Sequence, residues 1–306
     1  MLIRFGKTNR KATPCVATIG NFDGLHVGHQ AVIQRVVEQA QTSGLTSTVI
    51  TFDPPSRPGV RLMRFSDKLN RLHELGITQV ICLPFKAPLI TLSPEIFLTE
   101  YLIGLFSVRH LILCESFRFG SGQSGDVSYL QVAGPRCNLG LEVIPLLHQA
   151  GAPISSTRIR AALKAGDLNT AQRLLGQDFS LTGRVQPGDR LGRTLGFPTA
   201  NILLKPRYQT LSGVFVVQVI WQNALYFGVA NVGTRPTVGG TVCRVEVHLL
   251  DFEADLYGHR ISIRFLHQLR TEQCFENHQA LIIQISKDIQ AARRFINIKT
   301  EVETEQ

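Results

Sequence analysis

The stretch "CVATIGNFDGLHVGHQAVIQRVVEQAQTSG", residues 15–44, contains three successive patterns. Its first six residues are a mostly apolar run that ends in glycine, which is typical of a buried strand. A turn with two glycines follows. From residue 29 the apolar side chains recur at helical spacing, and a final glycine is placed to end that helix. The stretch therefore predicts a strand, a tight turn and a helix, which together begin a βαβ unit.

The same alternation continues through the first half of the chain. Strands are predicted at residues 47–52, 79–85, 110–115 and 141–146. Helices are predicted at residues 66–76 with Ser66 as N-cap, at 93–106 with Ser93 as N-cap and Pro94 at the first helical position, at 155–166 and at 167–176. Strands separated by helices indicate an α/β domain with a mostly parallel sheet and helices on both faces. Ligands of such sheets bind at the carboxyl ends of the strands.

After Gly183 the composition of the chain changes: glycine and proline become frequent and the apolar runs shorten. Strand-like segments follow one another without helices, which is typical of a small barrel or sandwich. Residues 277–295 form a last amphipathic segment that predicts a helix. We therefore expect two domains with a boundary near residues 176–183, and the length of 306 residues agrees with that number.

Composition indicates a globular enzyme without a membrane segment. Apolar residues make up 44% of the chain and charged residues 18%. The uncharged window at residues 208–234 is broken by polar residues and predicts two strands and a turn instead of a membrane helix. The first 12 residues lack a signal-peptide core, and the six cysteines show no CxxC spacing, so we expect a cytoplasmic protein with reduced thiols.

The net charge of +9 is spread along the chain without a run of like charge. Such a charge is compatible with nucleic-acid binding and equally with polyphosphate substrates. A nucleic-acid-binding barrel would need clustered Lys and Arg with interleaved aromatic side chains. The predicted barrel strands carry mainly Val, Ile and Leu instead. We therefore expect small-molecule partners, with no nucleic acid and no membrane; the sequence does not predict an oligomeric state.

His26 and His29 stand three residues apart at the start of the first helix. This spacing puts both rings on one side, next to backbone N–H groups at the positive end of the helix dipole. Donors in this arrangement are suited to triphosphate oxygens and to the charge of a leaving pyrophosphate. A structural pair of histidines and a metal pair are alternatives, although no third ligand is visible at a suitable spacing. The P-loop and GxGxxG phosphate motifs are absent.

The segment "GNFDGLHVGH" resembles the HxGH signature of the nucleotidyltransferase superfamily, in the form seen in bacterial FAD synthetases. Residues 154–160, "ISSTRIR", resemble the second phosphate motif of that superfamily, and residues 115–120, "ESFRFG", resemble the flavin-side loop of the family. In the second half, "GRVQPGDRLGRTLGFPTANI", "GVANVGTRPTV", "VEVHLLDFEADLYG" and "LRTEQCF" resemble riboflavin kinase. Nearly the whole chain thus resembles the bifunctional riboflavin kinase/FMN adenylyltransferase family.

The resemblance implies a Rossmann-like nucleotidyltransferase domain with a parallel sheet at residues 1–180. It also implies a riboflavin kinase domain at residues 181–306, built as a small antiparallel β-barrel with a C-terminal helix. The implied enzyme is a transferase with two activities. It phosphorylates riboflavin to FMN with ATP, then adenylylates FMN to FAD with a second ATP and releases pyrophosphate.

For the kinase, the resemblance implies that Glu246 is the catalytic base for the ribityl hydroxyl and that Thr199 and Asn201 bind Mg²⁺ with ATP. The i, i+2 spacing of this last pair puts both side chains on one face of an extended segment. The nucleotide would also contact Gly183, Arg184 and Gly188, and the flavin would contact Arg270 and Glu272. Seen alone, Glu246 is equally a solvent-facing residue on a strand, and "PTAN" is equally a plain turn.

For the adenylyltransferase, the resemblance implies that His26 and His29 are catalytic. The implied ATP-binding residues are Gly20, Asn21, Phe22, Asp23, Gly24, Ser156, Thr157 and Arg158, and the implied flavin-binding residues are Phe117, Arg118 and Phe119. Because the FMN phosphate is itself a nucleophile, catalysis needs positioning and charge stabilisation only. Phe22 and Phe117 are alternatively core residues, and Arg158 is alternatively an exposed residue at a helix start.

Two positions depart from the family pattern. Pro55 replaces the histidine of a Pro-His-Pro sequence, and Ser116 replaces an asparagine before Phe-Arg-Phe-Gly. The alternative that follows is a monofunctional riboflavin kinase with a degenerate adenylyltransferase domain, against which the intact HxGH and SSTR segments argue. A nucleotidyltransferase for another phosphate ester would leave PTAN and Glu246 without a purpose.

Overall fold

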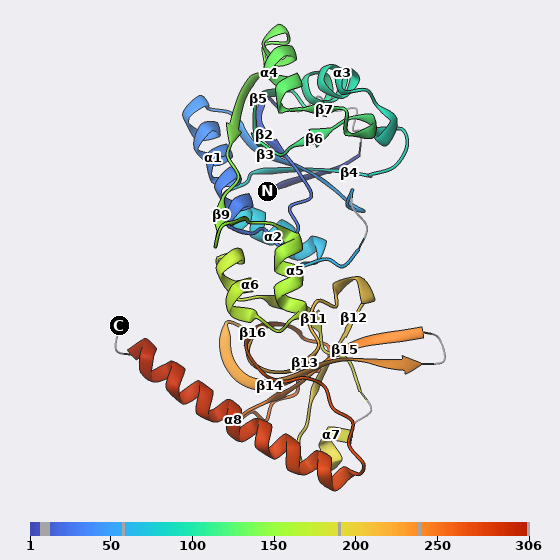
Figure 1. Cartoon of the computed structure of the whole chain (residues 1–306), viewed down its shortest axis with the longest axis vertical. Helices are drawn as coiled ribbons and strands as arrows, with labels where there is room; N and C mark the ends of the chain where they lie inside the picture. Colours follow the sequence, from blue (N-terminus) through green and yellow to red (C-terminus); the bar gives the residue numbers. More distant parts are fainter. Residues whose placement is uncertain (7–12, 57–58, 189–190, 238–239, 305–306) are drawn as a thin grey trace. The chain divides into compact units, whose positions relative to one another are not determined.

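The computed structural model describes residues 1–6, 13–56, 59–188, 191–237 and 240–304 (Figure 1). The chain forms two compact units: Met1–Gly59 with Met63–Ser156, and Val60–Leu62 with Thr157–Gln306. The helices α5 (Ser156–Lys164) and α6 (Leu168–Leu175), which the sequence analysis assigned to the first domain, belong almost entirely to the second unit. The domain limits 1–180 and 181–306 stay a prediction.

The first unit is built on a parallel sheet, as the βαβ pattern predicted. Its strand order is β1-β4-β3-β2-β5-β8, and every neighbouring pair is parallel. The strands are β1 (Leu2–Phe5), β2 (Cys15–Ile19), β3 (Thr46–Phe52), β4 (Gln79–Leu83), β5 (Val108–Cys114) and β8 (Gly140–Ile144). Five of the six were predicted, whereas the short edge strand β1 was missed. From β2 the chain adds β3 and then β4 on one side, and β5 and then β8 on the other. A topological switch point therefore lies between β2 and β5.

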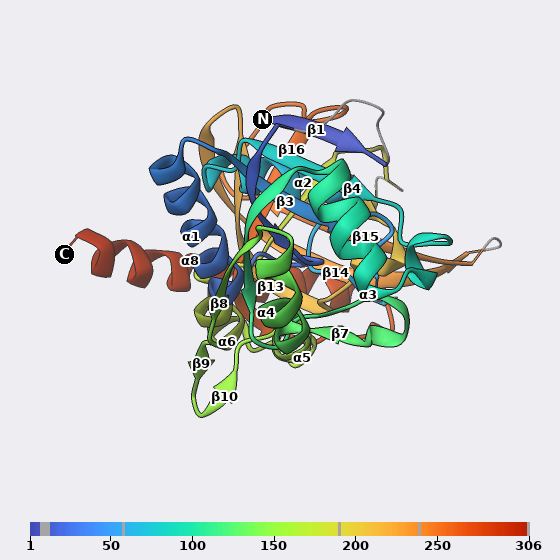
Figure 2. The same ribbon diagram turned by 90° about the horizontal axis from the view of Figure 1, so that it is seen from above.

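Helices cover both faces of this sheet (Figure 2). Consecutive strand residues separate into two cores: Val16 packs in one and Ala17 in the other, because side chains alternate across a strand. One core contains α1 (Val27–Ser43) and α2 (Phe65–Glu74). The other contains the helix of residues 94–105 and α4 (Val127–Arg136).

Several helix ends follow the predicted signals. Gly44 ends α1 in the left-handed region with φ 64°, and the Ser93 side chain accepts a hydrogen bond from Ile96 N. The helix that Ser93 begins is α-helical over α3 (Pro94–Ile96) and continues as a wider π-helix over η2 (Phe97–Leu105). The predicted N-cap Ser66 is wrong: α2 begins one residue earlier, and Ser66 Oγ donates to Asp67 Oδ1 instead.

The helix α4 was not predicted, because it contains Gly134 and Pro135, which are poor helix residues. Smaller elements of the first unit are η1 (Leu89–Thr91), β6 (Arg118–Phe119), η3 (Ser121–Gln123), β7 (Gly125–Asp126), β9 (His148–Gln149) and β10 (Ala152–Pro153). The pairs β6–β7 and β9–β10 are antiparallel hairpins.

The second unit is a nearly closed, six-stranded antiparallel barrel. Of the two folds that the sequence left open, a barrel and a sandwich, the structure shows the barrel. Its order is β11-β16-β13-β14-β15-β12, and a bridge between Gln186 and Asn201 joins the end of β11 to β12. The strands are β11 (Ser180–Arg184), β12 (Ala200–Leu204), β13 (Gly213–Trp221), β14 (Ala224–Thr237), β15 (Gly240–Leu249) and β16 (Arg260–Arg270); short helices lie at α7 (Leu191–Thr194) and η4 (Pro206–Tyr208). The uncharged window is a hairpin, and its turn residues Gln222 and Asn223 have φ of 49° and 64°, as a tight hairpin turn needs.

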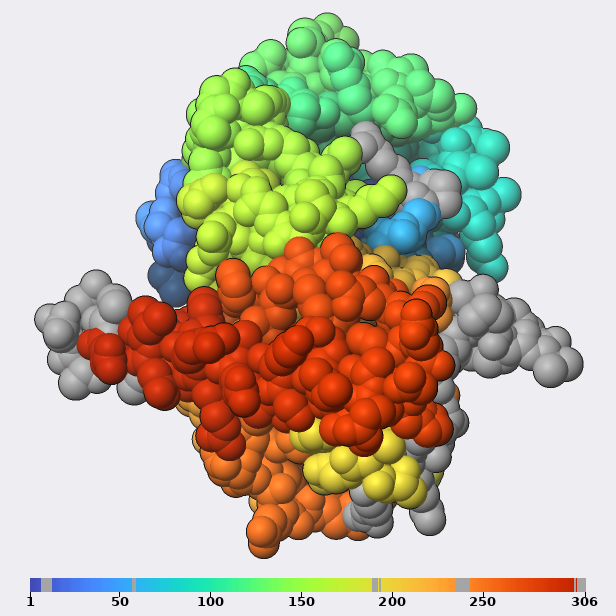
Figure 3. Space-filling view, turned by 60° about the horizontal axis from the view of Figure 1, so that its bottom comes forward, coloured from blue at the N-terminus to red at the C-terminus, as the bar shows by residue number. Residues whose placement is uncertain are grey.

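The C-terminal helix α8 (His278–Thr304) lies along the surface of the barrel (Figure 3). Ala292 on α8 is fully buried against Val214, Val216 and Val229 of the barrel strands. The helix therefore packs across the strands β13, β14 and β16 of the barrel. Over the residues that the structure describes, no helix combines the length and the apolar character needed to cross a membrane.

Candidate functional site

The segment Gly20–Gly24, which we call the glycine turn, lies at the carboxyl end of β2, beside the switch point. Phe22, Gly24 and the following Leu25 have φ of 48°, 83° and 45°. Phe22 and Leu25 are not glycine, and left-handed residues other than glycine are concentrated at functional sites. The turn reverses the chain sharply and directs it into α1. It thus places the α1 N-terminus at the ligand-binding edge of the sheet.

His26 and His29 lie together at this helix N-terminus. His26 is the N-cap of α1, and its Nδ1 accepts a hydrogen bond from His29 N at 3.3 Å. The two rings stack with centroids 3.6 Å apart, and His29 also meets the edge of the Phe22 ring at 5.1 Å. Phe22 is buried in the core, which confirms the alternative that it is a core residue. Its ring also contacts His29 of the pair.

Both histidines are uncharged in the free protein at neutral pH. Burial lowers the pKa of His26 from 6.5 to about 4. Burial, followed by electrostatic interaction with His26 and with Lys68, lowers the pKa of His29 well below 6.5. Because His26 Nδ1 accepts a hydrogen bond, the single proton of its neutral ring is on Nε2. The pair therefore offers N–H donors to an anion, and not positive charge.

The second phosphate motif meets the first through Ser156. This serine begins α5, and its Oγ donates to Asp23 O in the glycine turn at 2.8 Å. Thr157 and Arg158 follow in the same helical turn, at the start of the second unit. The structure thus joins Ser156 to the glycine turn, while a role of Thr157 and Arg158 with ATP stays a prediction.

The predicted flavin-side residues differ in accessibility. Phe119 is buried in the core, and Phe117 is half-buried and stacks on it with centroids 5.5 Å apart. Arg118 is exposed and pairs with Asp126 at 2.6 Å, where Asp126 also caps α4. Among the three, Phe117 and Arg118 retain surface that a ligand can reach.

The two departures from the family pattern have different surroundings. Ser116 is exposed, and its Oγ lies 3.8 Å from Cys114 Sγ. Next to Pro55, Ser56 makes two hydrogen bonds with the Asn21 side chain, of 2.7 Å to its Nδ2 and 3.0 Å to its Oδ1. The loop after β3 is therefore fastened to the glycine turn without a histidine.

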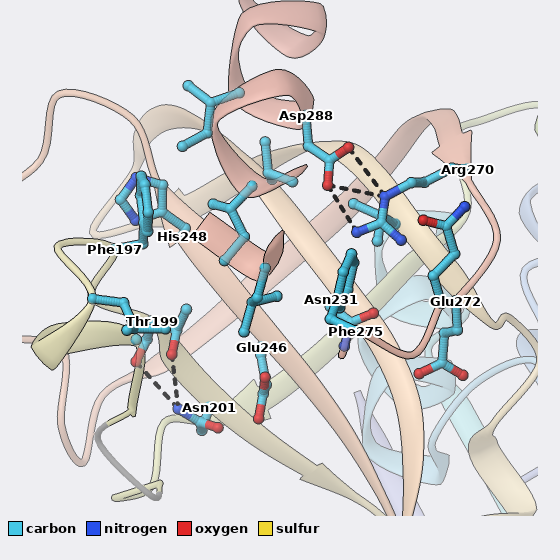
Figure 4. Close-up of a pocket in the computed structure, with 18 of the residues that line it drawn as sticks. Phe197, Thr199, Asn201, Asn231, Glu246, His248, Arg270, Glu272, Phe275 and Asp288 are labelled. Carbon is cyan, nitrogen blue, oxygen red and sulfur yellow. Dashed lines mark hydrogen bonds and ion pairs between the residues drawn. The ribbon is translucent and has the colours of Figure 1, made fainter. Parts of the chain in front are cut away.

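The second unit contains a pocket of about 360 Å³ that gathers most of the predicted kinase residues (Figure 4). Thr199 and Asn201 come from the segment around the start of β12, Glu246 from β15, and Arg270 and Glu272 from the end of β16. The volume is in the range of small-molecule sites. Its apolar part is lined by Val214, Val229, Phe275, Leu281, Ile285 and Ile289.

Asn201 has a free acceptor at this pocket. Its Nδ2 donates to Thr199 O and Oγ1, at 3.2 and 3.4 Å, whereas its buried Oδ1 has no hydrogen-bond partner among the residues that the structure describes. Gly188 gives this side chain its space: a Cβ at position 188 would lie 2.6 Å from Asn201 Cγ. A buried amide oxygen without a donor, next to a threonine hydroxyl, suits a hard cation that brings further oxygen ligands.

Arg244, Glu246 and His248 share one face of β15, because side chains alternate across a strand. Arg244 Nη1 lies 3.4 Å from Glu246 Oε1, and both side chains are largely buried, so Glu246 is not a solvent-facing strand residue. His248 Nδ1 lies 2.9 Å from Pro198 O, and its ring meets the edge of Phe197. A carbonyl oxygen can only accept, so His248 Nδ1 carries a proton and ties β15 to the residue before Thr199.

Arg270 makes a bidentate ion pair with Asp288 of α8, with distances of 2.9 to 3.1 Å. Its guanidinium also lies over the Phe275 ring, 5.7 Å from the centroid. Glu272 accepts a hydrogen bond from Ser212 Oγ and packs against Gly233, where a Cβ would collide with its carboxylate. The segment after β16 is thus fastened to α8 and to the barrel.

The Arg270–Asp288 pair predicts a large effect on stability. Asp288→Ala should lower the free energy of unfolding by about 3 kcal/mol, because it leaves a buried guanidinium without its carboxylate. The two side chains are only 16% and 7% exposed. Denaturant unfolding followed by circular dichroism measures this difference. Asp251→Ala removes an exposed partner of Arg293 on the same helix and should change little, so equal effects of the two variants would contradict the prediction.

Gly183 and Arg184 do not line the pocket. Gly183 packs against Ile202 inside the barrel, and Arg184 is exposed and donates to Gly258 O at 2.8 Å. Asp189 and Arg190 of the "GRVQPGDRLGRTLGFPTANI" motif, and Val238 of "GVANVGTRPTV", lie outside the described residues.

Sequence reasoning missed several residues that the structure brings to these sites. Asn231, Phe275 and Asp288 line the pocket, and both Asn231 and Phe275 belong to quoted motifs in which they were not singled out. Lys68 lies under the glycine turn, where its Nζ donates to Asn21 O at 2.7 Å. Asp288 and Lys68 sit on helices far along the chain from their partners, so no local spacing marks them.

Comparisons with known proteins show what the two parts of the chain are similar to. A family model described as FAD synthetase matches residues 8–158, and one described as riboflavin kinase matches residues 175–296. A bifunctional riboflavin kinase/FMN adenylyltransferase from Escherichia coli (strain K12) is 39% identical over 292 residues, which are 93% of each chain. One from Pseudomonas fluorescens is 42% identical over 287 residues, 91% of this chain and 92% of its own. A solved structure described as a macrolide-efflux protein from Streptococcus pneumoniae matches with a TM-score of 0.83 at 27% identity, over 96% of this chain and 99% of that one.

Proposed function

The chain belongs to the bifunctional riboflavin kinase/FMN adenylyltransferase family, and on that premise we propose which of its residues carry each reaction. The enzyme phosphorylates riboflavin to FMN with ATP and adenylylates FMN to FAD with a second ATP. Both domains match their family models, which supports the bifunctional interpretation over a monofunctional kinase with a degenerate first domain. A cytoplasmic location, and the absence of nucleic-acid and membrane partners, remain predictions.

The kinase reaction takes place in the pocket of the second unit, and the observation that carries this proposal is the convergence of Thr199, Asn201 and Glu246 there. Glu246 accepts the proton of the ribityl hydroxyl as that oxygen attacks the γ-phosphorus of ATP. The apolar part of the pocket receives the flavin ring, next to Arg270 and Glu272. Because Gly188 has no side chain, it leaves the space that the Asn201 side chain occupies.

Mg²⁺ is the metal that the kinase residues suit. The free Oδ1 of Asn201 and the hydroxyl of Thr199 are neutral oxygens, and the cation would find its other ligands in phosphates and water. When bound, Mg²⁺ neutralises the charge that develops on the transferred phosphoryl group. Among the described residues, no three His, Cys, Asp or Glu side chains form a metal cluster, so this site would depend on the nucleotide for its charged ligands.

The adenylyl reaction takes place at the glycine turn of the first unit. A phosphate oxygen of FMN attacks the α-phosphorus of ATP, and the bond to the leaving pyrophosphate breaks without a covalent enzyme intermediate. The N–H groups of the turn and of the α1 N-terminus, with His26 and His29, hold the phosphate oxygens. Ser156, Thr157 and Arg158 complete the ATP site. Phe117 and Arg118 face the flavin, and Phe119 supports Phe117 from the core.

Gly188→Ala tests the proposed magnesium and ATP site. The added Cβ forces the Asn201 side chain to move, so the KM for Mg·ATP in riboflavin phosphorylation should rise about tenfold, the equivalent of roughly 1.4 kcal/mol of lost binding. Product chromatography over time, at several Mg²⁺ concentrations, measures FMN and FAD separately. Adenylylation of supplied FMN serves as the internal control and should not change. An unchanged KM would remove Asn201 from the site.

A further inference from the structure

Lys68 is a buried charged residue beside the adenylyl site to which neither reaction assigns a role. It belongs to α2, yet its side chain is only 6% exposed. A lysine near a helix surface normally extends its ammonium to water, because burial of this charge costs several kcal/mol. Here the Nζ atom turns inward and donates to Asn21 O at 2.7 Å and to Thr51 Oγ1 at 3.4 Å. The ammonium thus lies directly against the glycine turn.

The contacts of Lys68 complete a clamp on Asn21. The Asn21 carbonyl accepts from Lys68 and from Thr51 Oγ1, while its side-chain amide is held by Ser56. Asn21 directly precedes Phe22, the first left-handed residue of the turn. Since the peptide of Asn21 determines where the following N–H groups point, this clamp controls the geometry of the phosphate-binding edge.

We propose that Lys68 is a positioning residue of the adenylyltransferase: it holds the glycine turn through Asn21 O and places a buried positive charge against that turn. The inference rests on the proposed role of this turn and needs no contact between Lys68 and a substrate. The charge favours anions at the site, such as the triphosphate of ATP and the leaving pyrophosphate.

The protonation of the histidine pair agrees with this role. After burial and His26, the charge of Lys68 is the next cause that holds the pKa of His29 low. Among the described residues, Lys68 acts electrostatically on His29 of α1 and on Cys82 of β4. Burial raises the pKa of Cys82 to about 11, and both Asp53 and Lys68 act on it. The thiol therefore stays neutral over the range in which the enzyme would be assayed.

Lys68→Met in the full chain removes the ammonium and keeps the length of the side chain. We expect the kcat for FAD formation from supplied FMN to fall about 10- to 100-fold, as for other displaced catalytic groups. Riboflavin phosphorylation should stay within twofold of the wild type. The pKa of His29, followed by NMR and assigned with His29→Asn, should rise. Lys86→Met is the matched control, because Lys86 is exposed in the loop after β4.

Lys68→Arg retains the charge and should return the pKa of His29 toward the wild-type value, with partial recovery of the rate. If Lys68→Met lowers only the unfolding temperature, and leaves kcat and the pKa of His29 unchanged, Lys68 is structural and the inference is wrong. If Lys68→Met does not fold, Lys68→Arg decides instead. A folded Lys68→Arg variant that keeps neither the wild-type kcat of adenylylation nor the wild-type pKa of His29 would overturn the inference. If the wild type itself forms no FAD from FMN, the proposed function fails instead.

Discussion

Glu246→Gln should lower the kcat of riboflavin phosphorylation about 10³-fold, within the range of 10²- to 10⁴-fold that general bases contribute. The amide has the shape of the carboxylate and keeps the position on β15, so the pocket should remain intact. What is lost is an acceptor for the proton of the ribityl hydroxyl as the phosphoryl group is transferred. The variant should still convert supplied FMN to FAD, because that reaction uses the first unit.

The measurement is the initial rate of FMN formation from riboflavin, Mg²⁺ and ATP, separated by chromatography. Glu253→Gln is a suitable control, because Glu253 is exposed and does not line the pocket. Binding of riboflavin by Glu246→Gln should remain close to that of the wild type, which separates a loss of chemistry from a loss of binding. A variant that keeps its full kcat would make Glu246 a structural partner of Arg244 only.

The fold was largely predictable, because its strands and helices have local signals. Apolar runs gave five of the six strands of the sheet, and N-caps such as Ser93 together with closing glycines gave most of the helices. The failures occurred where the signal was weak. Strand β1 is short and lies at an edge, α4 carries Gly134 and Pro135, and the helix after Pro94 widens to π geometry.

The candidate sites were predictable only in part, for a different physical reason. Thr199, Asn201 and Glu246 belong to compact motifs, and the pocket brings them together. The partner of Arg270 is Asp288, 18 residues later on α8, and the partner of Asn21 is Lys68, 47 residues later. Such pairs depend on tertiary packing. Burial also decides protonation, so the sequence interpretation of His26 and His29 as charge-neutralising groups could not anticipate two neutral rings.

His26→Ala should stop the reaction sequence at FMN. Removal of one donor from a charge-stabilising site costs about 10²- to 10³-fold in kcat, so FMN should accumulate while FAD forms only slowly. Alanine also deletes the N-cap of α1, because His26 Nδ1 accepts from His29 N. His26→Ser separates the two roles, since serine caps well but does not replace the Nε2–H donor. We expect both variants to lose adenylylation and only His26→Ala to lose stability; His148→Ala, at an exposed histidine, should match the wild type.

The pH dependence follows from the direction of the histidine shifts. The folded pKa of His26 is about 4, below its ordinary 6.5, so between these values the unfolded chain binds more protons than the folded one. Stability should therefore fall as the pH drops through this window. Adenylylation should persist to about pH 5 and fail near pH 4, when protonation of Nδ1 breaks the bond from His29 N. A rate limb near pH 6.5 in the wild type would mean that these rings titrate as exposed histidines, and that they do not act as neutral donors in the buried stack.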